Sequence, residues 1–194
     1  MKVCRLQQDG KITYMGKKLI VHDNVLRRLK HMVNKKNKEI AGNLSFEETK
    51  KELVITGFLN INKGSTANVK VVLQRVSFHT HPCFLYAREA TDFGWPSLTD
   101  YRSLINHSRK TDIHIVASCE GLWFVCFTPS FMNRIKKPDG CTRMLYTAQD
   151  AISKTGKKEK NKKKWTERVM QHCRHLSSLR CNGTRILNVT FFRW

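Results

Sequence analysis

The residues best placed to do chemistry are two histidines in the run His79-Thr80-His81-Pro82. Side chains alternate between the two faces of an extended strand, so histidines at positions i and i+2 point in the same direction. The preceding run, residues 69–78, is rich in β-branched and apolar residues and predicts such a strand. A carboxylate from the next element would complete a three-ligand site of the kind that holds catalytic zinc.

Three segments of the chain stand in a characteristic order: Glu39-Ile40-Ala41-Gly42-Asn43-Leu44, the His79–Pro82 run, and Ser97-Leu98-Thr99-Asp100. Together they resemble the signature of the JAMM/MPN+ metalloproteases. The resemblance covers residues 10–130 and implies an MPN/JAB-like zinc hydrolase. Such enzymes most often cleave isopeptide bonds to ubiquitin or a ubiquitin-like protein. The stretch from His-Thr-His-Pro to Gly-Trp-Pro-Ser is also similar to a version found in proteins of large DNA viruses.

The resemblance also implies a role for each site residue. His79, His81 and Asp100 would bind Zn²⁺, which lowers the pKa of a bound water and polarises the carbonyl under attack. Glu39 would accept the proton of that water and pass it to the leaving amine. The Ser97 hydroxyl would stabilise the oxyanion of the tetrahedral intermediate.

The third ligand departs from the family pattern. Typical members have about ten residues between the second histidine and the aspartate, a spacing that selects Asp92, whereas the Ser-x-x-Asp context selects Asp100. We assign Asp100, because residues 93–96 (Phe-Gly-Trp-Pro) cannot start a helix after Asp92. Residues 83–95 then form an insertion beside the metal. Ser97 and Asp100 also match a capping box, a role that we expect to compete with zinc binding by Asp100.

Charge is the second dominant feature of the chain. The formal net charge is +21, which predicts attraction to nucleic acid or another polyanion. Residues 131–194 carry 16 Lys and Arg against 4 Asp and Glu, whereas residues 1–130 carry 20 against 11. The densest run should be solvated and is the candidate nucleic-acid contact: Lys157, Lys158, Lys160, Lys162, Lys163 and Lys164. The alternative is a lysine-rich surface that only keeps the protein in solution.

The seven cysteines are odd in number and include no Cys-x-x-Cys pair, which predicts reduced thiols in the cytoplasm or nucleus. Cys83 is then a packed loop thiol. If the protein is viral, association with the virion is expected. The N-terminus lacks the apolar core of a signal peptide, and no apolar run approaches membrane-spanning length, so no membrane partner is expected. His172-Cys173-x-His175 is interpreted as surface residues of a helix rather than a second metal site.

The elements that position these residues predict an α+β fold, a mixed sheet flanked by helices. A hairpin is expected at residues 2–15 with its turn at Asp9-Gly10. Residues 18–21 lead into a helix capped by Asp23 or Asn24. Further strands are expected at residues 39–46, 52–61, 69–78, 113–118, 122–128 and 186–194, and further helices at 98–105, 142–153 and 165–179.

Two units are expected along the chain. Residues 1–135 would form the JAMM/MPN-like metalloprotease domain, and residues 136–194 a basic, helix-rich C-terminal extension that does not fold alone. Residues 186–194 are apolar enough to dock on the main sheet. The competing function is a non-enzymatic MPN scaffold or a nucleic-acid-binding structural protein, for example a virion component.

Overall fold

The computed structural model describes residues 12–35, 38–65, 69, 72–83, 96–107, 110–134 and 162–194. Its strands are β1 (Thr13–Tyr14), β2 (Lys17–Val21), β3 (Ile40–Glu48), β4 (Glu52–Lys63), β5 (Val76–Thr80), β6 (Ile113–Ala117), β7 (Gly121–Phe127), β8 (Arg180–Cys181), β9 (Thr184–Arg185) and β10 (Leu187–Arg193). Its helices are α1 (Asp23–Lys35), α3 (Leu98–Asn106), α4 (Pro129–Arg134) and α6 (Lys162–Ser178).

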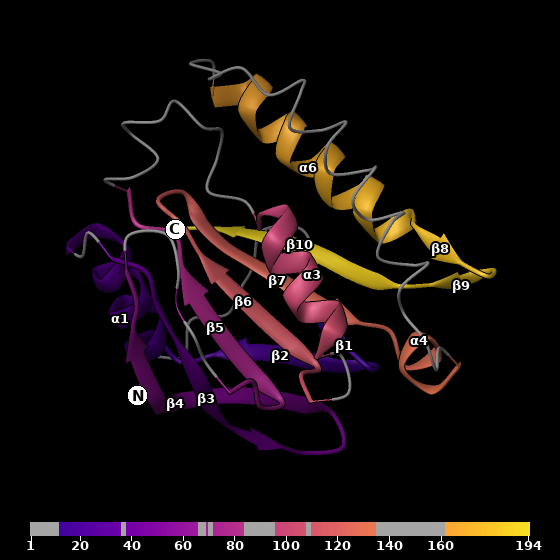
Figure 1. The fold of residues 1–194 in the computed structure, drawn as a ribbon, viewed down its shortest axis with the longest axis horizontal. Coiled ribbons are helices and arrows are strands. Elements are labelled where there is room, and N and C mark those ends of the chain that lie inside the picture. Colours follow the sequence, from indigo (N-terminus) through magenta and orange to yellow (C-terminus); the bar gives the residue numbers. More distant parts are fainter. Residues whose placement is uncertain are drawn as a thin grey trace.

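Eight of these strands form one sheet in the order β1-β2-β4-β3-β5-β6-β7-β10, and β8 and β9 form a separate hairpin. The pairs β2–β4 and β5–β6 are parallel, and the other neighbours are antiparallel. Helices lie against both faces of the sheet (Figure 1). The α+β class expected from the sequence is therefore confirmed, whereas the finer likeness to an MPN/JAB fold stays a prediction.

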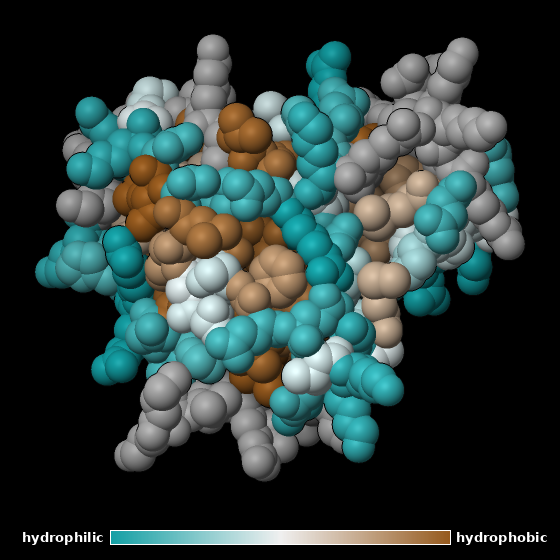
Figure 2. Space-filling view, turned by 90° about the horizontal axis from the view of Figure 1, so that it is seen from below, coloured by the Kyte–Doolittle hydropathy of each residue, from teal (hydrophilic) through white to brown (hydrophobic). Residues whose placement is uncertain are grey.

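One face of the sheet is covered by α1. Val25, Leu29 and Val33 recur at the spacing of one helix face and are fully buried. They belong to a core that includes Phe78 of β5 and Ile115 of β6. Full burial of each such aliphatic side chain stabilises the fold by about 1.5–3 kcal/mol. The opposite face of α1 carries charged side chains into solvent. Figure 2 shows one side of the molecule, on which hydrophilic residues surround an apolar area.

The other face of the sheet is covered by α3, α4 and α6. Tyr101 of α3, Phe131 of α4 and Leu176 of α6 are buried in a second core that also contains Val116 and Trp123. Because Ile115 and Val116 are consecutive strand residues, they enter opposite cores. The central strands are thus buried on both sides, which gives the site a rigid support.

The C-terminal strand completes this sheet. All seven residues of β10 pair with β7, from Leu187 opposite Phe127 to Arg193 opposite Gly121. The docking expected for residues 186–194 is therefore confirmed. A segment from the far end of the chain thus shares a sheet with the strands that carry the candidate site.

Three local features were not predicted. Residues 18–21, expected only to lead into the helix that begins at Asp23, also pair in parallel with residues 52–55 of β4. Pro129–Arg134 forms a short helix after the sheet. Asn182-Gly183, with φ of 50° and 74°, forms the turn between β8 and β9, a hairpin that the Asn-Gly signal should have predicted.

Several expectations fall outside the described residues. These are the turn at Asp9-Gly10, residues 142–153, Asp92 with nearly all of the insertion, the boundary at residue 135, and Lys157, Lys158 and Lys160. Lys162, Lys163 and Lys164 begin α6, where only the backbone is described. Within the described part, the first hairpin turns at Met15-Gly16, both with positive φ. None of the described helices has the length and apolar character needed to span a membrane.

Candidate metal centre

The candidate site is built on β5, whose side chains point alternately to the two faces of the sheet. Phe78 and Val76 enter the core beneath α1, so Ser77 and His79 point to the opposite face. Thr80 accepts a hydrogen bond at Oγ1 from the backbone N–H of Ile40 at 3.0 Å. His81 follows the strand, and its backbone N–H donates to the Ala117 carbonyl at 2.7 Å. Both strand neighbours therefore fix the end of β5 where the two imidazoles lie.

Asp100 of α3 joins these imidazoles. The Nε2 atoms of His79 and His81 lie 2.9 Å apart. Asp100 Oδ1 lies 3.2 Å from His79 Nε2, and Oδ2 lies 3.4 Å from His81 Nε2. The three residues form a group that could hold a metal ion, with one candidate ligand atom from each. Asp92, the other candidate, lies outside the described residues.

The three residues suit a single metal ion in donor type and proximity. One candidate ligand atom from each residue lies within 4.8 Å of the other two. Two neutral imidazoles and one carboxylate are a ligand set that suits zinc. The donor set of the three residues therefore fits a zinc ion.

Asp100 also caps its own helix, as the Ser-x-x-Asp pattern predicted. Asp100 Oδ2 accepts the backbone N–H of Ser97 at 2.6 Å, and Ser97 Oγ accepts the backbone N–H of Asp100 at 3.2 Å. This reciprocal capping box orients the carboxylate and leaves Oδ1 directed at His79. The same carboxylate thus caps the helix and approaches His79. The exposed Ser97 hydroxyl retains its own hydrogen for a further bond.

The second ring nitrogen of His79 contacts a buried series of polar side chains. His79 Nδ1 lies 2.7 Å from Nε2 of His114, a residue of β6. His114 Nδ1 lies 2.7 Å from the Ser77 hydroxyl oxygen. Because Nδ1 of His79 is occupied in this way, Nε2 is the nitrogen that faces Asp100. His114 was absent from the sequence prediction, since an isolated histidine in an apolar strand carries no motif.

Glu39 immediately precedes β3 and lies near His81. The antiparallel register pairs Ala41 with His79, so two residues farther along Glu39 comes alongside His81. Gly42 permits the close approach of β3 to β4 next to this site, because an added Cβ there would lie 1.8 Å from the Asn60 carbonyl oxygen. Burial raises the pKa of Glu39 to about 7, and the nearby Asp100 adds to this, while His81 opposes it. A carboxyl with a pKa near neutrality can both accept and donate a proton at physiological pH.

The protonation states of the other groups also suit metal binding. Burial by itself would raise the pKa of Asp100, but His79 and His81 outweigh burial and hold that pKa well below its usual value. Burial, followed by the influence of His79, holds the pKa of His114 well below its usual value. Asp100 is therefore an anion and His114 is neutral near pH 7.

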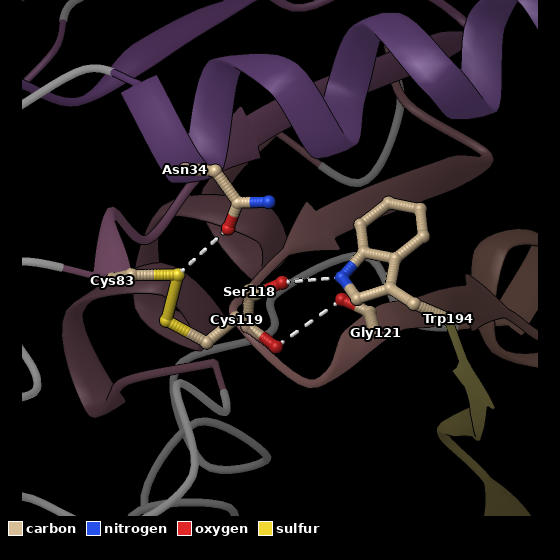
Figure 3. Close-up of a disulfide and its surroundings, with 6 residues drawn as sticks. All are labelled: Asn34, Cys83, Ser118, Cys119, Gly121 and Trp194. Carbon is tan, nitrogen blue, oxygen red and sulfur yellow. Dashed lines mark hydrogen bonds between the residues drawn. A yellow bond between two sulfur atoms is a disulfide. The ribbon is translucent and has the colours of Figure 1, made fainter.

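A disulfide closes the loop that follows the histidines. Cys83 and Cys119 are bonded, with their Cα atoms 5.1 Å apart (Figure 3). Cys83 Sγ lies 3.1 Å from Asn34 Oδ1, and the Trp194 indole donates to the Ser118 carbonyl at 2.8 Å. The expectation of reduced thiols throughout is therefore wrong for these two cysteines. Their pairing depends on the tertiary approach of two loops that are 36 residues apart, which no local spacing reveals.

Two further residues differ from expectation. His172 is only 2% exposed and packs edge-on against the Trp123 ring, and Cys173 is 6% exposed, so neither is a surface residue of α6. Among the described residues, the only group that could hold a metal is the one at His79.

Comparison with known proteins gives one partial likeness. No protein-family model matches the chain. A stretch of 78 residues is 37% identical to part of the uncharacterized protein 3R of Frog virus 3. That stretch is 40% of this chain but only 17% of the viral protein. The chain is therefore similar to a segment of a viral protein and carries a His-His-Asp group that could bind a metal ion.

Proposed function

We propose that this protein is a zinc-dependent hydrolase of the JAMM type, an isopeptidase that removes ubiquitin or a ubiquitin-like protein from conjugates. The observation that carries the proposal is the meeting of His79, His81 and Asp100 within reach of one metal ion, with Glu39 nearby. The order of these residues along the chain is that of the JAMM signature.

The residues of the site suit a hydrolytic reaction. When bound, zinc would supply a Lewis acid for the scissile carbonyl and for a water molecule. Glu39 would take a proton from the attacking water and return it to the leaving amine, for which a pKa near 7 is well matched. The Ser97 hydroxyl would donate to the developing oxyanion. Asp100, held by its capping box, would keep the ligand set in place.

A binding function for nucleic acid or another polyanion is a second proposal, supported by the net charge of +21. It can coexist with hydrolysis, because the densest charge lies in residues 157–164 and outside the ligand set. A purely structural scaffold, including a virion component, would need neither the ligand set nor a carboxyl with a raised pKa beside it. The likeness to the Frog virus 3 protein supports a viral setting but names no activity.

The decisive experiment combines metal analysis with a cleavage assay on the purified chain. We expect about one zinc per chain, loss of cleavage of ubiquitin conjugates after chelation, and recovery on adding zinc. Glu39→Gln should retain zinc and lose cleavage, whereas Glu47→Gln, at an exposed position on β3, should cleave normally. A folded parent that takes up no zinc would refute the proposal. Zinc uptake without cleavage of any ubiquitin-type conjugate would leave a metal site but refute the substrate.

A further inference from the structure

His114 lies in the middle of β6 and is 4% exposed. The parallel register places Ser77 opposite His114 and His79 opposite Val116. Side chains at paired positions point to the same face, so the His114 ring lies between the Ser77 hydroxyl and the His79 ring. Both of its nitrogens are used, each in a contact of 2.7 Å.

These contacts constrain where the protons lie. A neutral imidazole has one N–H donor and one acceptor nitrogen, so two ring nitrogens 2.7 Å apart must share one proton between them. If His114 Nε2 accepts from His79 Nδ1–H, His114 Nδ1 must donate to Ser77. If His114 Nε2 donates instead, Ser77 must donate to Nδ1. The two hydrogen bonds therefore share one direction: both donate from His79 toward Ser77, or both donate from Ser77 toward His79.

We infer that His114, oriented by Ser77, is a positioning residue that holds His79 in the tautomer that binds metal. A metal ion on His79 Nε2 requires a bare nitrogen there, so Nδ1 carries the proton and donates to His114. His114 then donates to the Ser77 hydroxyl oxygen. This arrangement fixes the plane of the His79 ring and raises the basicity of Nε2. The inference rests on the proposed metal site. It adds to that site His114, which is 35 positions from His79 in the sequence.

The test measures zinc affinity by competition with a chromophoric chelator. His114→Leu removes the acceptor and should weaken zinc binding about 10- to 100-fold. His114→Gln places an amide oxygen near the former Nε2 and should recover most of the affinity. His172→Leu is the matched control, because His172 is an equally buried histidine, packed against Trp123 and outside the ligand set. Its zinc affinity should equal that of the parent.

Nitrogen NMR of the zinc-loaded parent provides a second measurement, which needs no variant to fold. The inference expects the protons of His79 and His114 on Nδ1 in both rings. A proton on Nε2 of His114, or undiminished zinc binding by His114→Leu, would overturn the inference and leave the proposed function intact. Failure of the folded parent to bind zinc would instead overturn the proposed function on which it rests.

Discussion

Replacing Glu39 by glutamine should stabilise the metal-free protein, and the gain should depend on pH. Burial raises the pKa of Glu39 from 4.5 to about 7, so the folded protein holds this proton more tightly than the unfolded chain does. Below pH 4.5 the group is neutral in both states and costs nothing. Between pH 4.5 and about 7 the unfolded chain ionises while the folded protein keeps its proton, so the folded protein loses stability, and above about 7 it carries a partly buried charge.

The magnitude follows from the size of the shift. A pKa rise of this extent corresponds to at most about 3 kcal/mol, and partial exposure of the carboxyl reduces that to about 1–2 kcal/mol. Glutamine does not ionise, so Glu39→Gln should match the parent near pH 4.5 and exceed its free energy of unfolding by about 1–2 kcal/mol at pH 8.

Urea unfolding of metal-free protein at the two pH values measures this difference. Glu47→Gln is the control, because Glu47 is exposed and its difference from the parent should be the same at both pH values. Added zinc should shrink the advantage of Glu39→Gln, since a nearby cation favours the carboxylate. A parent that gains stability over Glu39→Gln as pH rises would refute the reasoning, because Glu39 would then be a favourably paired anion.

Three further predictions concern the capping box, the disulfide and the basic run. Asp100→Asn should lose zinc, while its amide oxygen keeps the helix capped. Ser97→Ala should keep zinc and lose about 1 kcal/mol of stability. Equal loss of zinc in the two variants would contradict separate roles for the two residues. The double variant Cys83→Ser/Cys119→Ser should unfold at lower urea, with a loss of at most about 4 kcal/mol for a loop of this length, and mass spectrometry should show the bond in the parent only. Replacing the six lysines of residues 157–164 by glutamine should leave the zinc content unchanged. It should reduce the slope of the logarithm of the DNA-binding constant against the logarithm of salt concentration by up to about 5. An unchanged slope would show that other residues contact the DNA.

The sequence by itself determined the features that depend on local periodicity. Alternation along a strand placed His79 and His81 on one side, and the spacing of Val25, Leu29 and Val33 defined the buried face of α1. The Ser-x-x-Asp pattern predicted the start of α3 at the correct residue. Each of these follows from residues within one or two turns of chain, where steric and hydrogen-bonding preferences act directly.

Tertiary structure alone decided which distant groups meet. His114 reaches His79 through the parallel register of β5 and β6, and Glu39 reaches His81 through the antiparallel register of β3 and β5. The Cys83–Cys119 bond likewise joins two loops that the fold brings together. A strand can pair with several others at little difference in local preference, so its register depends on burying the whole sheet between two helical layers. That choice is made by the complete core, and no short segment of the sequence contains it.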